Sequence, residues 1–379
     1  MSAANLWIVA GVAVCLVSGV ARAESEACPP RCATGKIALG IVAPASGSSA
    51  AFGRQALKPA EIAVRELNAG GGIMGIAVEL VVGDDRCDPG LAVSVAKRQV
   101  EVDKISVVVG PVCPAAADST ASIYSAAGVI QFLPTVPTVG STRQNLDQMF
   151  RMVATDEQEA QALGAYLGRE HRGKKLVVVY TDAFYRRAIA NLVKAALPAD
   201  MKTAAQFEPL MDATGMYDRS VDRLQRNPPD IIYLALDNAM VLEFVGKLRK
   251  RGVKSFLIGG QRLYSQDLLS AAGEAAERIH VIAPIGSLTN PELLKAVDLL
   301  KQADVSPDLV ALNTYAAIQA WAEAVRRAGT GNRQKVVEML RSGEFQTAVG
   351  VLAFDQQGAR RDISYSTLTW QGGQLKVGN

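Results

Sequence analysis

Short apolar runs alternate with amphipathic segments along most of this chain. The apolar runs, such as residues 105–109 and 129–133, show no polar face, which is typical of parallel strands buried on both sides. The segments between them carry apolar residues at helical spacing. This alternation predicts an α/β protein with parallel sheets and crossover helices. Strands are expected at residues 36–42, 77–82, 105–109, 129–133, 175–180, 203–207, 230–235, 255–258, 280–283, 350–354 and 365–370.

The strand–helix rhythm occurs twice. One series of strands ends at residue 133 and a second begins at residue 175. The chain is also too long for one ordinary hydrophobic core, so we expect two lobes. Helices are expected at residues 54–67, 91–100, 115–126, 157–170, 184–196, 217–226, 239–251 and 309–328, the last of which is strongly apolar.

The N-terminus has the pattern of a secretory signal. Residues 6–20 form an uncharged apolar run of roughly 15 residues, shorter than the ~20 that span a membrane. Ala21-Arg22-Ala23 follows as a small-x-small cleavage pattern. Cys15 does not favour a lipoprotein, because the residue before it, Val14, is bulky. We expect a signal peptide at 1–23 cleaved after Ala23, a tail at 24–33, and export to the periplasm.

Charge and histidine content exclude several functions. The formal net charge is only +3, so nucleic acid and anionic membranes are not expected partners. His171 and His280 are the two histidines, and neither has a second metal-type ligand at useful spacing. Metal catalysis and Ser-His-Asp chemistry are therefore not supported, and no cofactor or metal is expected.

Three motifs resemble enzyme signatures only in their letters. Gly70-x-Gly72-x-x-Gly75 follows a predicted helix and precedes a strand, whereas a dinucleotide fingerprint does the reverse. Ser94-x-x-Lys97 lacks the companion motifs of penicillin-binding enzymes and is interpreted as a helix surface. The acidic group around Asp84 is interpreted as a strand-end turn, with Asp88 capping the next helix, rather than as a cation site.

Four cysteines remain after the predicted signal, which in an exported protein is consistent with two disulfides. Cys87 and Cys113 each follow a predicted strand, at the sheet edge where α/β proteins bind ligands. A bridge between them would close a loop of roughly 27 residues and stabilise the fold by about 3–4 kcal/mol. Cys28 and Cys32 could form a small local loop or stay reduced.

The segment around Cys87 and Cys113 resembles the Leu/Ile/Val-binding family of periplasmic solute-binding proteins, which carries a disulfide at this place. The resemblance extends over nearly the whole mature chain. It rests on short matches in the same order, at Ala45-Ser46-Gly47, Glu66-Leu67-Asn68-Ala69-Gly70-Gly71-Gly72-Ile73, Asp182-Ala183-Phe184-Tyr185, Thr314-Tyr315-Ala316-Ala317 and Phe354-Asp355-Gln356-Gln357-Gly358.

The resemblance implies a type I periplasmic binding protein, in which two Rossmann-like lobes with parallel sheets are joined by three hinge strands. By this analogy, lobe one comprises residues 34–152 plus 284–356. Lobe two comprises residues 153–283 plus 357–379. It also implies a Cys87–Cys113 disulfide.

The ligand-binding positions depart from the pattern of amino-acid-binding members. A serine that grips the ligand α-carboxylate is replaced by Pro114, and a threonine after the fourth strand is replaced by Pro137. Asp237 stands in place of a tyrosine. The acid that pairs with the ligand ammonium is replaced by Gln261, which is followed by Arg262. Burying a zwitterion without these partners is costly, so the ligand is expected not to be a free α-amino acid.

Other positions keep a binding character. Phe52 matches an aromatic wall of the family's cleft, and Tyr185 matches a tyrosine of the second lobe that faces the ligand. Thr135 and Val136 offer backbone groups, and Arg262 could hold a carboxylate with two parallel hydrogen bonds.

Some of these positions allow a purely structural role. Phe52 could pack in the core, Asp237 could cap the following helix, and Arg262 could be a solvated loop charge. Arg186 and Pro59 also depart from the family pattern, by replacing a glycine and by falling within a helix.

The sequence favours a periplasmic solute receptor for an ABC importer, which closes on an aromatic or apolar carboxylate or an amide. Its expected partners are that ligand and the membrane permease, and a monomer is expected. The alternatives are a sensory module of the same fold and a receptor for branched-chain amino acids. An exported enzyme is disfavoured, because the predicted cleft offers no nucleophile–base pair.

Overall fold

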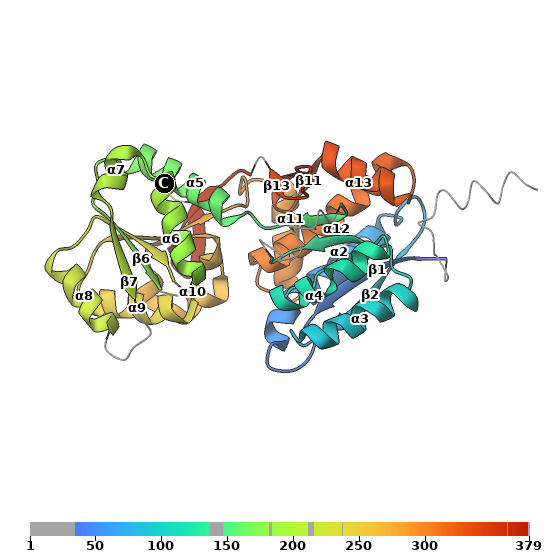
Figure 1. Cartoon of the computed structure of the whole chain (residues 1–379), viewed down its shortest axis with the longest axis horizontal. Coiled ribbons are helices and arrows are strands. Elements are labelled where there is room, and N and C mark those ends of the chain that lie inside the picture. The colour runs from blue at the N-terminus through green and yellow to red at the C-terminus, as the bar shows by residue number, and fades with distance from the viewer. Residues whose placement is uncertain are drawn as a thin grey trace, which may run out of the picture.

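The computed structural model describes residues 35–136, 147–181, 184–210, 216–236, 238–361 and 363–377, and it consists of two α/β lobes (Figure 1). We define lobe one by its five-stranded sheet and lobe two by its seven-stranded sheet. The α/β class and the parallel-rich sheets predicted from the sequence are confirmed. The predicted tail at 24–33, the signal at 1–23, Cys28 and Cys32 lie outside the described residues.

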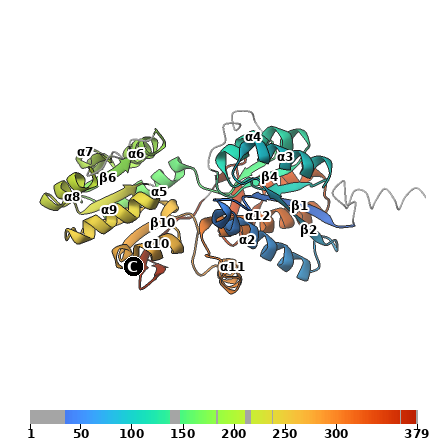
Figure 2. The ribbon, with the colours of Figure 1, turned by 90° about the horizontal axis from the view of Figure 1, so that it is seen from below.

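Lobe one is a parallel sheet covered by helices on both faces. Its strand order is β2-β1-β3-β4-β5, and all four neighbouring pairs are parallel. Helices α3 and α4 cover one face, and α2 and α12 cover the other (Figure 2). The strands are β1 (Ile37–Ala43), β2 (Val78–Asp84), β3 (Val107–Val109), β4 (Ile130–Leu133) and β5 (Met149–Arg151). The helices are α2 (Ala50–Ala69), α3 (Pro89–Glu101), α4 (Pro114–Ala126), α11 (Pro291–Gln302), α12 (Leu309–Ala328) and α13 (Arg333–Ser342).

A small antiparallel sheet completes the core of lobe one. Its strands are β11 (Glu344–Thr347), β12 (Gly350–Phe354) and β13 (Arg360–Arg361). Phe345 and Phe354 are buried in the same apolar cluster as β1 and α12, and Phe354 packs edge-on against Phe150 of β5. Residues distant in sequence are therefore held in one core.

Lobe two places a mixed sheet between two helical layers. Its order is β15-β14-β10-β9-β8-β6-β7, with antiparallel pairing only where β14 and β15 join at one edge. The strands are β6 (Leu176–Thr181), β7 (Gln206–Leu210), β8 (Ile231–Ala235), β9 (Phe256–Gly259), β10 (Ile279–Ala283), β14 (Ser366–Gln371) and β15 (Gln374–Val377). The helices are α5 (Asp156–Glu170), α6 (Phe184–Ala196), α7 (Ala199–Ala204), α8 (Met216–Arg226), α9 (Asn238–Lys250) and α10 (Gln266–Ala272), with short 3₁₀ turns η2 (Gln261–Leu263) and η3 (Gly273–Ala276).

The chain passes between the lobes three times, after β5, after β10 and after β13. The crossing segments bond to one another. Gly286 N donates to Ser364 O at 3.1 Å, and Arg151 N donates to Gly358 O at 2.8 Å. Among the described residues, no helix is long and apolar enough to cross a membrane.

Local signals explain several element ends. Asp88 caps α3 by accepting from Leu91 N at 2.8 Å, as the sequence predicted. Asp308 begins α12 in the same way, and Gly329 ends it in the left-handed region at φ 63°. The glycines from Gly70 to Gly75 form the turn between α2 and β2, so the interpretation of this motif as a helix end is confirmed.

One strand expectation is wrong. Residues 203–207 were expected to be extended, but α7 occupies Ala199–Ala204 and the strand β7 runs over Gln206–Leu210. Tertiary contact decides this boundary, because Met201 is buried against the α5–α6 layer and anchors the short helix. Pro59 lies inside a continuous α2, where it is buried.

The predicted disulfide is present between Cys87 and Cys113, whose Cα atoms lie 5.4 Å apart. It ties the end of β2 to the start of α4.

We expect the double substitution Cys87→Ala/Cys113→Ala to lower the free energy of unfolding by about 3–4 kcal/mol, because the unfolded chain regains loop entropy. Urea unfolding of the oxidised proteins measures this change. The matched control is Cys28→Ala/Cys32→Ala, and a double variant at Cys87 and Cys113 as stable as the parent would contradict the prediction.

Candidate functional site

The carboxyl ends of β1, β3 and β4 meet at one edge of lobe one and carry most of its predicted site residues. Phe52 lies in the first turn of α2 and is 39% exposed, so its ring is not part of the core. Pro114 is the first residue of α4 and is exposed. Thr135 and Val136 follow β4. This is the edge at which open α/β sheets bind ligands.

Hydrogen bonds fix the loops of this edge to one another. Thr135 Oγ1 donates to Val112 O at 2.6 Å, which joins the loop after β4 to the loop after β3. Asn313 of α12 is buried and donates from Nδ2 to Pro134 O at 2.9 Å. Gln131 Nε2 donates to Gly110 O at 3.0 Å. The Thr135 side chain is therefore a brace of the site, which the sequence did not show.

Gly110 allows the close approach of β3 to β1 at this edge. Its φ is +102°, and a Cβ placed there would overlap Val42 O of β1. The loop after β1 is held from the other side, because the Asp84 carboxylate accepts from Ala45 N at 2.9 Å and from Ser46 Oγ at 2.5 Å. These hydrogen bonds keep the pKa of Asp84 below its usual value, although burial opposes them. Asp84 acts as a turn residue, as predicted.

The N-terminus of α4 is open at the same edge. Its N-cap is Cys113, whose side chain is in the disulfide and makes no capping hydrogen bond. Pro114 at the first helical position has no N–H to offer. The positive end of the helix dipole therefore lies here without an acidic cap, a setting that favours an anionic or hydrogen-bond-accepting ligand group.

Lobe two presents its site residues at the carboxyl ends of β6 and β9. Tyr185 falls in the first turn of α6, with its side chain outside the described residues. Gln261 and Arg262 form the η2 turn after β9. Pro137, Asp237 and the side chain of Arg186 lie outside the described residues.

Gln261 is a buried residue, only 9% exposed. Its side-chain Nε2 donates to Ala154 O, at the first crossing, at 3.2 Å. Its Oε1 is buried and has no hydrogen-bond partner among the described residues. Arg262, the next residue, is exposed. The short η2 turn thus carries both a hydrogen-bond acceptor, Gln261 Oε1, and a positive charge, the Arg262 guanidinium.

Sequence reasoning missed Glu159, which lies beneath this turn. Glu159 is 7% exposed and accepts from Gln261 N at 2.9 Å and from the Tyr233 hydroxyl at 3.1 Å. Burial raises its pKa to about 6, against the lowering effect of the Gln261 N–H. A signal was present, because Glu159 shares one helical face with the buried Leu163 and Leu167.

A groove of about 650 Å³ lies between the lobes. Arg54 and Gln55 of α2 line it from lobe one, and Tyr264 lines it from lobe two. Burial raises the pKa of the Tyr264 phenol to about 12. The ring packs against the apolar clusters of both lobes, so it joins the two cores beside the η2 turn.

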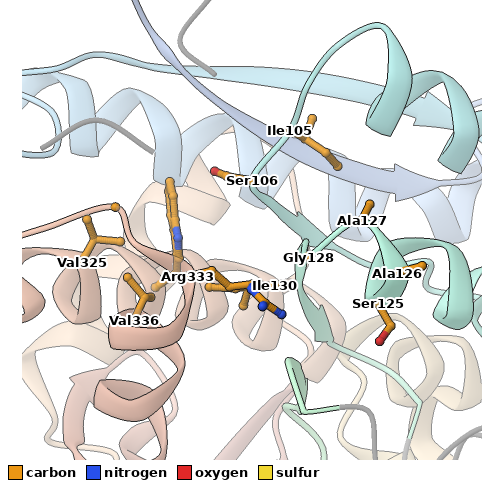
Figure 3. A pocket seen from close by; sticks show the side chains of 12 residues that line it. Ile105, Ser106, Ser125, Ala126, Ala127, Gly128, Ile130, Val325, Arg333 and Val336 are labelled. Atoms are coloured by element: carbon orange, nitrogen blue, oxygen red, sulfur yellow. The ribbon is translucent and has the colours of Figure 1, made fainter. Parts of the chain in front are cut away.

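A second hollow, of about 430 Å³, lies at the opposite edge of the lobe-one sheet (Figure 3). It is lined by Ile105 and Ile130, where β3 and β4 begin, together with Arg333 of α13. Arg333 Nη1 already donates to Gln148 Oε1 at 2.7 Å. The amino edge of a parallel sheet is not where this architecture binds ligands, so the carboxyl edge is the candidate site.

Two α/β lobes joined by three crossings form an architecture in which the lobes can close around a ligand held between them. A sequence model described as periplasmic binding protein matches residues 36–374, and the chain belongs to this family. Solute-binding proteins, not enzymes, make up the family, and its members work in the periplasm.

Similar proteins agree with this assignment. An "Amino acid binding protein" of Pseudomonas aeruginosa is 27% identical, with 88% of this chain and 90% of that protein covered. "Leu/Ile/Val-binding protein homolog 3" of Brucella melitensis is 27% identical, with 98% and 99% covered.

Solved structures show the same fold. LivJ of Streptococcus pneumoniae in complex with isoleucine superposes with a TM-score of 0.75 at 23% identity, covering 90% of this chain and 98% of that one. A solute-binding protein of R. palustris in complex with benzoate gives a TM-score of 0.71 at 19% identity, covering 90% and 95%. These likenesses concern the fold and not the ligand.

Gly260 provides a test of the packing beneath the η2 turn. A Cβ at this position would overlap the Glu159 carboxyl. We expect Gly260→Ala to lower the free energy of unfolding by about 1–3 kcal/mol, because the buried carboxyl must move to make room. Urea unfolding measures it.

The matched control is Gly246→Ala in the middle of α9, where a Cβ meets no atom within 4 Å. That change should leave stability unchanged or raise it by up to about 1 kcal/mol, because alanine is the better helix former. Equal stability of the two variants would show that the carboxyl does not occupy this place.

Proposed function

We propose that this protein is the periplasmic solute receptor of an ABC importer of the branched-chain amino acid transporter type. Its two lobes close on a small ligand, and the closed form docks on the membrane permease. The proposal includes export with cleavage after Ala23 and a monomeric state. The receptor role is supported by the family membership and by relatives with amino acid- and Leu/Ile/Val-binding names.

The proposed lobe boundaries are those expected from the sequence. Lobe one would comprise residues 34–152 plus 284–356, and lobe two residues 153–283 plus 357–379. The three crossings supply the flexible connections that such a closure requires.

The proposed ligand is an aromatic or apolar carboxylate, or an amide, rather than a free α-amino acid. The observation that carries this is the pairing of a neutral, buried Gln261 with the cationic Arg262 at the η2 turn. An ammonium group needs a carboxylate or several acceptors, and η2 supplies one amide oxygen and a positive charge. Arg262 suits a carboxylate instead. Phe52 would supply an aromatic wall, and Pro114 an apolar contact at the mouth of α4.

The remaining predicted residues complete the proposed site. Thr135 and Val136 would present backbone groups from lobe one. Tyr185 would contact the ligand from lobe two, and Pro137 and Asp237 would line the cleft.

A receptor for branched-chain amino acids is the second candidate, favoured by the isoleucine complex of a protein with the same fold. Thermal shifts of the mature protein against leucine, valine, benzoate, phenylacetate and short amides separate the two. A ligand at 100 times its Kd adds about 2.7 kcal/mol of apparent stability. We expect shifts with aromatic acids or amides only. A shift with leucine or valine would overturn the proposed ligand class.

A sensory role would differ in the partner and not in the ligand. Capture of the ligand-loaded protein by the importer permease in vesicles, and ligand-stimulated ATP hydrolysis there, would support transport. Loaded protein that leaves ATP hydrolysis at its basal rate would favour the sensory alternative.

Phe52→Ala tests the aromatic wall. We expect the Kd of the ligand that stabilises the parent to rise at least about tenfold, equivalent to about 1.4 kcal/mol of lost contact. Isothermal titration calorimetry measures it, and urea unfolding of the ligand-free variant checks that the exposed ring is not needed for the fold. Val102→Ala, at an exposed apolar residue after α3, is the control and should bind as the parent does. Unchanged affinity in Phe52→Ala would remove this ring from the site.

A further inference from the structure

Glu159 is a buried carboxyl group placed directly under the turn that is proposed to hold the ligand. It comes from the first turn of α5, immediately after the first crossing between the lobes. Its two oxygens accept from a different element each, Oε2 from Gln261 N at 2.9 Å and Oε1 from the Tyr233 hydroxyl at 3.1 Å. The bare backbone of Gly260 lets the carboxyl approach this closely. The η2 turn is therefore joined to α5 and β8 through this one carboxyl group.

Among the described residues, ionisable side chains from four elements interact with Glu159. Asp156, on its own helix, opposes its ionisation, and Arg262 on η2 favours it. Tyr233 of β8 donates to it, and Tyr365, on the third crossing, interacts with it electrostatically. Arg262 is the cation among these groups. The charge on Glu159 is thus compensated in part by the residue that the proposed function assigns to the ligand.

We propose that Glu159 is a positioning residue that couples proton uptake to carboxylate binding at Arg262. When Glu159 is ionised, its negative charge partly offsets the positive charge of Arg262. When it takes up a proton from solvent, it becomes neutral and no longer offsets the positive charge of Arg262. The ligand class rests on the proposed function, whereas the ionisation of Glu159 and its effect on the η2 turn do not.

The sign of the coupling follows from electrostatics. A bound carboxylate engages Arg262 and adds a negative charge near Glu159, so both effects raise the pKa of Glu159 above its value of about 6 in the ligand-free protein. The ligand then prefers the protonated form, and by reciprocity affinity rises as pH falls through this range. A one-unit rise in pKa on binding corresponds to roughly tenfold tighter binding below the window than above it.

The ligand-free protein gives the first test. The backbone amide of Gln261 donates to Glu159, so its ¹H–¹⁵N resonance should titrate between pH 4.5 and 7.5 in the parent and stay flat in Glu159→Gln. Glu157→Gln removes an exposed carboxyl from the same turn of α5 and is the matched control, which should titrate as the parent does. A Gln261 amide that does not move with pH in the parent, or that still titrates in Glu159→Gln, would overturn the proposal.

Benzoate provides the second test, by calorimetry at pH 5.5 and pH 7.5, where it stays ionised. For a one-unit rise in the pKa of Glu159, we expect roughly sixfold tighter binding at pH 5.5 than at pH 7.5 in the parent and in Glu157→Gln, and a pH-independent Kd in Glu159→Gln. The same pH dependence in Glu159→Gln as in the parent would overturn the coupling.

The two tests separate the two proposals. If no aromatic acid or amide bound at either pH while the Gln261 amide titrated as expected, the proposed ligand class would be wrong. The proton-dependent position of the η2 turn would still be supported. If benzoate bound without pH dependence, the ligand class would be supported and the coupling overturned.

Discussion

The rest of the structure depends on how the three crossings between the lobes are bound to one another. Arg360 lies at the start of the third crossing, 2% exposed, and its guanidinium donates to Met152 O of the first crossing at 3.4 Å and to Val349 O of lobe one at 2.9 Å. Its own carbonyl accepts from Gln158 Nε2 of α5 at 2.8 Å. Burial lowers the pKa of Arg360 to about 10, so the group stays charged at neutral pH. A buried cation that satisfies backbone carbonyls of separate segments holds those segments in register, because leaving any of them unpaired is costly. Arg360 therefore holds the beginnings of the first and third crossings together.

The loops at the carboxyl edge of lobe one are also bonded to one another. The Cys87–Cys113 disulfide, the Asp84 carboxylate and the Thr135 hydroxyl each join two loops. Such bracing leaves fewer loop conformations to be fixed, which lowers the ordering cost of binding any ligand at this edge. The η2 turn of lobe two is built differently. It is held from below by Glu159, whose raised pKa of about 6 makes the turn sensitive to pH near neutrality, whereas the lowered pKa of Asp84 keeps the lobe-one loop bonded until the pH is more acidic.

Much of the fold was predictable from the sequence, because its signals were local. Helix α12 was predicted at its observed bounds. Asp308 and Gly329 mark its ends, and apolar residues cover all of its faces. Strands β5 and β13 were missed, because each is too short to show a period and is defined only by its neighbours. The boundary at residues 203–207 was wrong for a related reason, as the burial of Met201 outweighs local preference. At the site, the carboxyl edge followed from the positions of Cys87 and Cys113 after two predicted strands, whereas Phe52, Pro114 and Thr135 were assigned from the family resemblance.

Glu159 did not follow from the strand pattern: its helical spacing with Leu163 and Leu167 indicates a buried face, but not the partners of its carboxyl group. Its burial arises from Gly260 and Gln261, about a hundred residues away in sequence, which no local pattern connects to α5. This long-range placement also bears on the ligand. Gln261 is neutral, and the Glu159 carboxyl beneath it is buried and already accepts from Gln261 N and the Tyr233 hydroxyl, so the turn offers an ammonium group no exposed carboxylate. Arg262 and the uncapped end of α4 instead supply positive potential from both lobes, and closure would bring these potentials onto one ligand. The electrostatic balance of the two edges, more than any single contact, is what favours an anionic solute.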